Sequence, residues 1–208
     1  MSKQERISMS VIRRLPRYYR FLYDLKQNGI SRISSEKLAT QMGLTASQIR
    51  QDFNCFGGFG QQGYGYAVEQ LHAEIGKILG VEKSTPTILI GAGNMGRTIA
   101  TQIRFDTRGV KLIGIFDRKE DIIGTTIRDL TVQSDSEIKT FCENEHPKMA
   151  ILCIPKTAAP AIVDTLIEHG VTAFWNFSHY DINVAHPDAI VENVHLGDSL
   201  QTLACRMN

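Results

Sequence analysis

Residues 87–96 read TILIGAGNMG, an apolar run that leads directly into three glycines. The order G-x-G-x-x-G between a strand and a helix is typical of dinucleotide-binding folds. The first glycine of such a turn allows a sharp bend, the second lets a pyrophosphate approach the backbone, and the third lets the helix pack closely on the strand. Free N–H groups at the start of the helix then face the anion. The turn residues expected to contact a nucleotide are Gly91, Ala92, Gly93, Asn94, Met95 and Gly96.

The sequence beyond this turn alternates between apolar strands and amphipathic helices. We predict strands at 110–116, 150–154 and 172–176, and helices near 135–143, at 158–169 and at 197–207. Such alternation is typical of an α/β fold, and here it predicts a Rossmann-type doubly wound parallel sheet.

Ligands of doubly wound sheets bind at the carboxyl ends of the strands. Asp117 follows the second strand, where an acid binds the adenosine ribose hydroxyls and disfavours a 2′-phosphate, so NAD is expected in preference to NADP. The neighbouring Arg118 weakens that preference, because a basic side chain could accept the phosphate. The strand ends predicted to lie near a nicotinamide ring carry Ile154, Pro155, Asn176 and Ser178.

The first 66 residues are basic, with ten Lys and Arg residues against four Asp and Glu residues, although the net charge of the whole chain is only +1. A basic surface suits a polyanion, but the same surplus can be an ordinary solvated face. Charge alone leaves both interpretations open.

The hydrophobic pattern of this basic segment predicts a series of helices. An apolar residue recurs every three or four positions from Leu15 to Leu25, and Gly29 ends the pattern, which indicates an amphipathic helix. Pro16 is compatible with the first turn of that helix, so a short separate helix is expected before it.

Two further short helices follow. Ser34 or Ser35 can cap the first of them, which Gly43 closes in the left-handed conformation. Residues 45–48 have the T-x-x-Q form of a capping box and start a second helix, predicted to run through Ile49, Phe53 and Phe56. Two short helices joined by a glycine-containing turn indicate a helix-turn-helix.

Residues 57–66, GGFGQQGYGY, alternate glycines with aromatic residues and predict a β-hairpin or wing after the second helix. A helix-turn-helix with a wing favours DNA binding over a protein-interaction module, and the polar outward side of the second helix suits base edges and phosphates. The residues expected to contact DNA are Arg14, Arg17, Thr45, Ser47, Gln48, Arg50, Gln51, Asn54, Gly60, Gln61 and Gln62, with further phosphate contacts from Arg13 and Arg32.

Composition excludes several other classes. No apolar run reaches the roughly 18 to 20 residues that cross a bilayer, and MSKQERISMS lacks the apolar core of a signal peptide, so a cytoplasmic protein is expected. Cys55, Cys142, Cys153 and Cys205 form no CxxC pair, so we expect no disulfide framework and no metal site.

The wing sequence FGGFGQQGYGY, followed by the GAGNMG turn, resembles the family of redox-sensing transcriptional repressors called Rex, and the likeness covers nearly the whole chain. This resemblance implies a homodimeric, non-enzymatic repressor that binds an inverted-repeat operator. It implies that the protein senses the NADH/NAD+ ratio and leaves DNA when NADH binds. It also implies that the C-terminal helix is exchanged between subunits, which would give the apolar stripe Leu200, Leu203 and Met207 a partner.

Site residues can be carried over from the family by position. Arg20 matches an arginine that links the two domains, while Asp52 and Gly60 match the recognition helix and the wing. Gln51 and Gln62 replace basic residues of many members, which implies fewer phosphate contacts and a different base preference.

Two further departures concern the predicted switch, which consists of Arg20, Gln102 and His195. Gln102 stands where many members have a tyrosine near the nicotinamide, and His195 stands where many have an aspartate. Because a histidine can change charge near neutral pH, we hypothesise that the release of DNA by NADH depends on pH.

These observations predict two domains: a winged-helix DNA-binding domain over residues 1–80 and an NAD(H)-binding domain over 85–208. The alternative is a small NAD-dependent oxidoreductase, for which His179, His186 or His195 could donate a proton, although the chain has no substrate domain. A module that binds CoA or another nucleotide is a third interpretation, because glycines that hold a phosphate do not identify the base.

Overall fold

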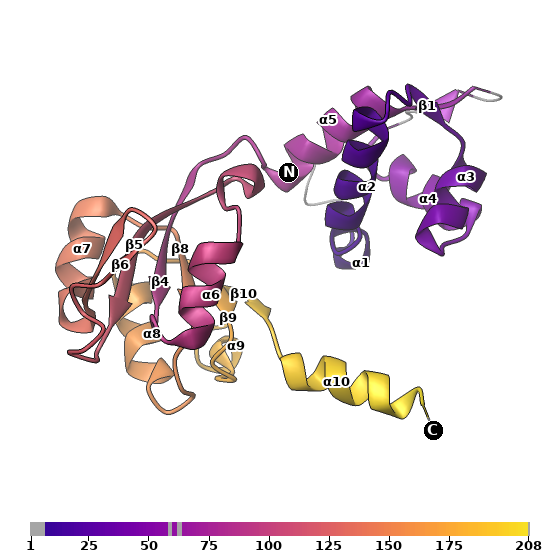
Figure 1. The fold of residues 1–208 in the computed structure, drawn as a ribbon. Helices are drawn as coiled ribbons and strands as arrows, with labels where there is room; N and C mark the ends of the chain where they lie inside the picture. The colour runs from indigo at the N-terminus through magenta and orange to yellow at the C-terminus, as the bar shows by residue number, and fades with distance from the viewer. Residues whose placement is uncertain (1–6, 58–59, 62–63, 208) are drawn as a thin grey trace. The chain divides into compact units, whose positions relative to one another are not determined.

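The computed structural model describes residues 7–57, 60–61 and 64–207. The chain divides into two compact units, Met1–Glu82 and Lys83–Asn208 (Figure 1). Among the described residues, no helix combines the length and the apolar character needed to cross a membrane.

The first unit is mainly helical. Its elements are α1 (Met9–Ile12), α2 (Leu15–Gln27), β1 (Arg32–Ile33), α3 (Ser35–Met42), α4 (Ala46–Asn54), β2 (Gly60–Gln61), β3 (Gly65–Ala67) and α5 (Val68–Leu79). Pro16 lies in the first turn of α2, and the short α1 precedes it, as predicted.

The helix-turn-helix consists of α3, a turn of three residues and α4. The hydroxyl of Ser34 accepts a hydrogen bond from Lys37 N at 3.2 Å, and Gly43 ends α3 with φ +62°. The hydroxyl of Thr45 caps α4 by accepting from Gln48 N at 3.1 Å. The reciprocal half of the predicted capping box is absent, because the Gln48 amide bonds to Asp52 instead. Phe56 was predicted within this helix, but α4 ends at Asn54 and Phe56 packs into the core beyond it.

The wing is a three-stranded antiparallel sheet in the order β1-β3-β2. Gly60 pairs with Tyr66, and Arg32 pairs with Ala67. The Tyr66 ring meets the Phe53 ring edge-on at a centroid distance of 5.0 Å, so the wing shares the core of the helices. Gln62, predicted to contact DNA, lies outside the described residues.

The second unit is an α/β layer structure around a seven-stranded sheet in the order β10-β9-β8-β4-β5-β7-β6. Its strands are β4 (Thr85–Ile90), β5 (Val110–Asp117), β6 (Thr126–Ile127), β7 (Leu130–Ser134), β8 (Met149–Leu152), β9 (Ala173–Asn176) and β10 (Ile190–Asn193). All neighbours pair in parallel except β6 and β7, and the parallel strands follow the 3-2-1-4-5-6 order of a Rossmann fold. The predicted doubly wound sheet is confirmed.

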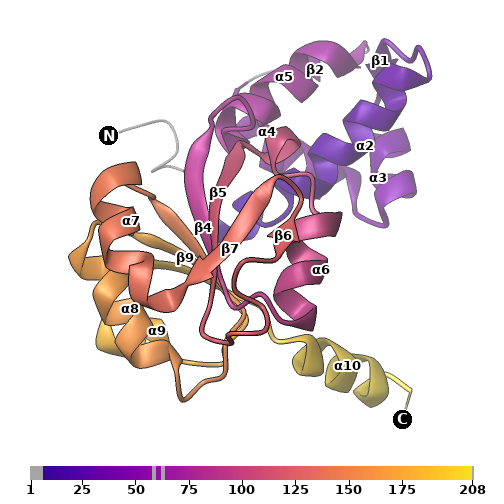
Figure 2. The ribbon, with the colours of Figure 1, turned by 60° about the vertical axis from the view of Figure 1, so that its left-hand side comes forward.

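Helices cover both faces of this sheet (Figure 2). The helical elements of this unit are α6 (Asn94–Gln102), the 3-10 turns η2 (Asp106–Arg108) and η3 (Asp135–Glu137), α7 (Ile138–Glu145), α8 (Ala159–Glu168), α9 (Ile182–Ala185) and α10 (Leu196–Cys205), of which α10 lies away from the sheet. Ile88 and Ile90 of β4 pack in the core beneath α7 and α8, while Leu89 packs in the core beneath α6. Alternate residues of the central strand therefore serve opposite faces.

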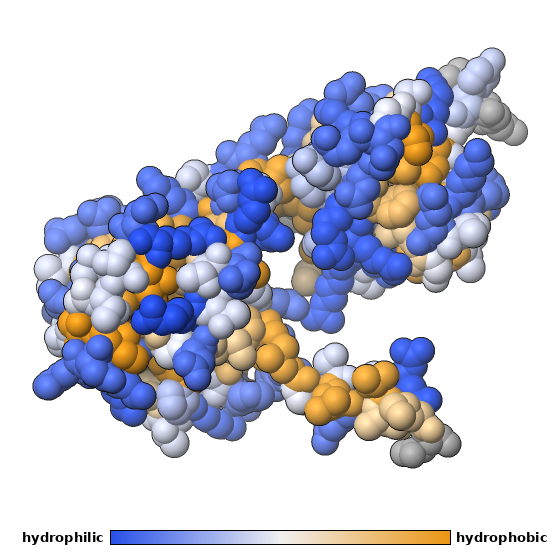
Figure 3. Space-filling model, in the orientation of Figure 1, coloured by the Kyte–Doolittle hydropathy of each residue, from blue (hydrophilic) through white to orange (hydrophobic). Residues whose placement is uncertain are grey.

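The last helix, α10, contributes no buried residue to the described chain. Leu196, Leu200, Leu203 and Met207 are 59%, 68%, 56% and 79% exposed. Figure 3 shows apolar surface along α10. An isolated helix of this length is marginal in water, so this face requires a packing partner.

Candidate functional site

The glycine turn lies between β4 and α6, at the carboxyl end of the central strand. Gly91 has φ +95°, and a Cβ at this position would collide with the carbonyl group of Cys153. Gly96 lies in the first turn of α6, where a Cβ would overlap the Gly91 carbonyl oxygen and lie 3.1 Å from Leu89 Cδ2. These two glycines are thus required by the protein's own packing.

Gly93 differs from the other two glycines of the motif. It caps α6 with φ −66° and ψ −170°, and a Cβ built on it has no protein atom within 4 Å. Gly93, Asn94 and Met95 are exposed at the amino end of the helix. The turn therefore presents open backbone and free N–H groups, which fits the pyrophosphate of a dinucleotide.

Asp117 supports this turn from the end of β5. It is 9% exposed, and its carboxylate accepts hydrogen bonds from Ala92 N at 2.7 Å and from Lys119 N at 2.9 Å. The contact that sequence analysis expected from Asp117, to ribose hydroxyls, stays a prediction. The side chain of Arg118 next to it is exposed.

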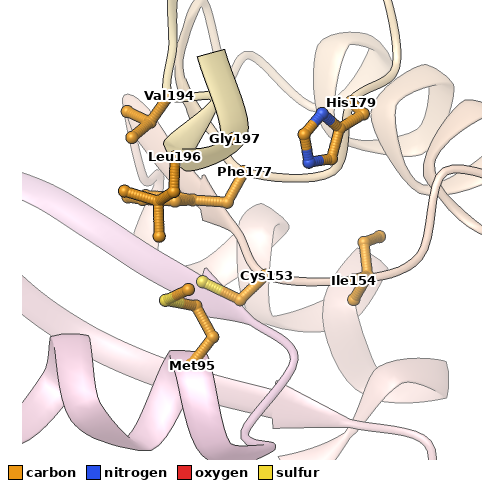
Figure 4. A pocket seen from close by; sticks show the side chains of 8 residues that line it. All are labelled: Met95, Cys153, Ile154, Phe177, His179, Val194, Leu196 and Gly197. Atoms are coloured by element: carbon orange, nitrogen blue, oxygen red, sulfur yellow. The ribbon is translucent and has the colours of Figure 1, made fainter. Parts of the chain in front are cut away.

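A cavity of about 200 Å³ opens beside the turn, as Figure 4 shows. Side chains from the start of α6, from the segments that follow β8, β9 and β10, and from the start of α10 line it. The lining residues are Met95, Cys153, Ile154, Phe177, His179, Val194, Leu196 and Gly197. Burial raises the pKa of the Cys153 thiol to about 12, so the sulfur is uncharged at neutral pH.

Two of the predicted ring contacts do not line this cavity. Asn176 and Ser178 are 0% and 2% exposed. The Asn176 amide oxygen accepts from Ser178 Oγ at 2.6 Å, and its nitrogen donates to Asn193 Oδ1 at 2.8 Å. These side chains join β9 to β10. Phe177 and His179, from the same segment after β9, line the cavity instead, and the prediction did not include them.

Met95 and Ile154 line the cavity, while Pro155, which follows Ile154, is exposed; their contacts with a cofactor stay predictions. His179 has φ +59°, and its Nδ1 lies 3.1 Å from Nδ1 of His195. Among the residues that the structure describes, no group of three or more His, Cys, Asp or Glu side chains could hold a metal ion.

The predicted switch residues are dispersed over the chain. His195 is placed at the rim of the cavity by its contact with His179. Gln102 is exposed at the end of α6, and Arg20 is exposed on α2 in the first unit.

In the first unit, α4 exposes most of its predicted DNA-contacting residues. The exposed ones are Thr45, Ser47, Arg50, Gln51 and Asn54. Arg50 donates from Nη1 to Ser35 Oγ at 2.9 Å and to Glu36 Oε1 at 3.2 Å, which ties the side chain to α3. Arg17 is exposed on α2, Arg13 is exposed at the end of α1, and Arg32 donates to Tyr64 O at 3.3 Å in the wing. Gly60 and Gln61 form β2.

Gln48 and Arg14 have a partner that the sequence pattern did not predict, the buried carboxylate of Asp52. Asp52 Oδ2 accepts from Arg14 Nε at 2.7 Å and from Tyr18 Oη at 2.7 Å. Oδ1 accepts from Arg14 Nη2 and from Gln48 Nε2, both at 2.8 Å. Burial alone would raise the pKa of Asp52, but these hydrogen bonds outweigh it and hold the pKa below its ordinary value. Asp52 itself is 0% exposed and faces inward.

Comparison with known proteins covers both units. Residues 6–54 match a family model described as "Putative DNA-binding protein N-terminus", and residues 82–180 match one described as "CoA binding domain". The redox-sensing transcriptional repressor Rex of Caldanaerobacter subterraneus subsp. tengcongensis is 53% identical over 208 residues, which are 100% of this chain and 92% of that protein. The Rex repressor of Clostridium perfringens is 47% identical over 100% of this chain and 98% of its own.

Solved structures agree with these relatives. The crystal structure of RSP in complex with β-NAD+ and operator DNA is 50% identical, with a TM-score of 0.90 over 97% of this chain and 93% of that chain. RSP in complex with β-NADH is 47% identical, with a TM-score of 0.88 over 97% of this chain and 94% of that chain. Since such relatives match the chain over its whole length, the chain belongs to the Rex family of redox-sensing transcriptional repressors.

Proposed function

We propose that this protein is a transcriptional repressor that binds an inverted-repeat operator through its winged helix and is released from it by NADH. The observation that carries this proposal is the open backbone of the turn at Gly93, beside a largely apolar cavity that Met95 of the same turn lines, in a chain that also holds a helix-turn-helix with a wing. The relatives named as Rex and the RSP complexes with NADH, NAD+ and operator DNA support it.

The lining of the cavity explains how the redox state could be distinguished. Bound nicotinamide supplies a ring that is cationic in NAD+ and neutral in NADH. The described residues that line the cavity include no carboxylate to balance the cation, and Cys153, protonated at neutral pH, offers no thiolate. Because burying an unpaired charge is costly, the neutral reduced ring is favoured.

Residues of the turn would hold the rest of the dinucleotide. The backbone at Gly93 and the amino end of α6 receive the pyrophosphate, and Asp117 keeps the turn in place through Ala92 N. The further contacts of Asp117, Arg118 and Ile154 with the cofactor are part of this proposal.

We assign no catalytic step to this site. The relatives are named as repressors, and the hydrogen-bonding partner of His179 is a second histidine rather than a carboxylate that would orient it as an acid or base. The exposed face of α10 supports a homodimer, because its four apolar side chains need a partner and a second copy offers the same face.

Fluorescence anisotropy of a labelled operator tests the proposal. Genomic fragments that the protein retains supply the duplex, which is then titrated with NADH at fixed NAD+. We expect NADH, but not NADPH, to release the DNA. DNA binding that NADH leaves unchanged would refute the sensor, and consumption of NADH with a small carbonyl substrate would favour an oxidoreductase.

A further inference from the structure

The carboxylate of Asp52 joins two helices of the DNA-binding unit. It lies on α4, the helix that the proposed function places against DNA, and it receives all four of its hydrogen bonds from Arg14, Tyr18 and Gln48. Arg14 is the N-cap residue of α2, and Tyr18 lies within α2, where it is fully buried. The pair with Arg14 therefore fixes the arginine side chain relative to the recognition helix.

The geometry of this ion pair leaves part of the guanidinium available. Arg14 binds Asp52 side-on, through Nε and Nη2, so two of its five N–H groups are used. Within the described residues, Nη1 makes no hydrogen bond, and the side chain is 28% exposed. A planar guanidinium held in this way presents its remaining N–H groups in a fixed direction, which suits a phosphate oxygen.

An internal carboxylate at a DNA-binding surface is otherwise difficult to explain. A negative charge opposes the approach of a polyanion, and the charge of Asp52 offsets that of Arg14. A long arginine side chain, however, loses much rotational freedom when it binds a phosphate. A partner that fixes the side chain before DNA arrives removes this loss from the binding step.

We propose that Asp52 is a positioning residue for DNA recognition, which holds the Arg14 guanidinium beside the recognition helix so that Nη1 binds a backbone phosphate. The inference rests on the proposed function, because it assumes that α4 docks on DNA. It assigns Arg14 a phosphate contact that depends on Asp52, and it predicts that Asp52 strengthens DNA binding despite its negative charge.

Salt dependence of operator binding separates this role from general stabilisation. Each phosphate neutralised contributes about 0.9 to the slope of log Kobs against log salt concentration. Loss of folded protein lowers the apparent affinity but leaves this slope unchanged. The slope of the full-length protein is measured by anisotropy with the operator duplex.

The variants are Arg14→Gln, Asp52→Asn and the double variant, with Asp24→Asn as a matched control. Asp24 is exposed on α2, so its substitution removes the same charge from the same unit without breaking the contact between Arg14 and Asp52. We expect Arg14→Gln and Asp52→Asn each to reduce the magnitude of the slope by about 1, and the double variant to reduce it no further. Asp52→Asn should weaken binding about 10-fold, by the same loss of one phosphate contact. Asp24→Asn should leave the slope unchanged and should not weaken binding.

Each other outcome is decisive. If Asp52→Asn binds as tightly as the parent or tighter, or if its slope is unchanged, Asp52 does not position Arg14.

Circular dichroism and NADH fluorescence report whether the variants fold. If Asp52→Asn fails to fold, Arg14→Lys is the deciding variant, because lysine keeps the positive charge but cannot bind Asp52 side-on. An operator affinity lowered about 10-fold supports the positioning role of Asp52, and an operator affinity equal to that of the parent overturns it. If the parent binds no operator, the proposed function itself fails, whereas operator binding with an unchanged slope in Arg14→Gln overturns this inference alone.

Discussion

Substituting two glycines of the turn by alanine should separate folding from nucleotide binding. In Gly96→Ala the new Cβ overlaps the Gly91 carbonyl oxygen and lies 3.0 Å from its carbon, so the backbone of the turn must shift. Overpacking of this kind costs about 3 kcal/mol. In Gly93→Ala the Cβ meets no protein atom and φ is −66°, so the unfolding free energy should change by less than about 1 kcal/mol.

Gly93→Ala should weaken nucleotide binding although it leaves stability nearly unchanged. The methyl group occupies the open space through which a pyrophosphate approaches the backbone. Loss of one hydrogen bond to a charged phosphate costs about 1.5–3 kcal/mol, which is about a 10- to 150-fold loss of NADH affinity.

Thermal unfolding without nucleotide and a fluorescence titration with NADH measure the two effects. For a domain of this size, Gly96→Ala should lower Tm by roughly 10 °C, and Gly93→Ala by no more than about 5 °C. The reasoning is refuted if Gly93→Ala binds NADH like the parent protein, or if the two variants lose equal stability.

Three further predictions concern α10 and the histidines. Leu203→Asp should convert a dimer into monomers, as measured by light scattering. The dissociation constant of the dimer should rise at least about 100-fold, because the substitution is present in both subunits. An unchanged mass would contradict the role of α10. Burial and the charge of Lys26 hold the pKa of His72 below its ordinary value of 6.5. The contribution of His72 to stability is therefore present above pH 6.5 and is lost as the pH falls below it. His72→Phe should make the stability of the first unit less dependent on pH below 6.5, and an unaltered pH profile would contradict this role of His72. His195→Ala should change the factor by which NADH weakens operator binding, because it removes the contact between Nδ1 of His195 and Nδ1 of His179, a residue that lines the cavity; an unchanged factor in anisotropy would refute a role for this contact.

Local sequence patterns predicted the elements well. The caps at Ser34, Gly43 and Thr45 lie where the sequence indicated, because each acts within one helical turn. The glycine turn was equally readable, since its spacing follows from the contact between one strand and the next helix.

Contacts between distant segments were not predictable in the same way. Asp52 and Arg14 are 38 positions apart, and helical periodicity made Arg14 an exposed cation and Asp52 part of a polar helix. Only the packing of α2 on α4 brings them together. Asn176 likewise looked like a residue of the ligand-binding edge, until the pairing of β9 with β10 placed it against Asn193.

The most direct test of the account is to measure the coupling between NADH and operator from both sides. Anisotropy gives the factor by which saturating NADH weakens operator binding, and NADH fluorescence gives the factor by which operator weakens NADH binding. Thermodynamic linkage requires the two factors to be equal, and we predict a value of at least about 10, with a smaller factor for NAD+. A factor of one from either side would contradict the account.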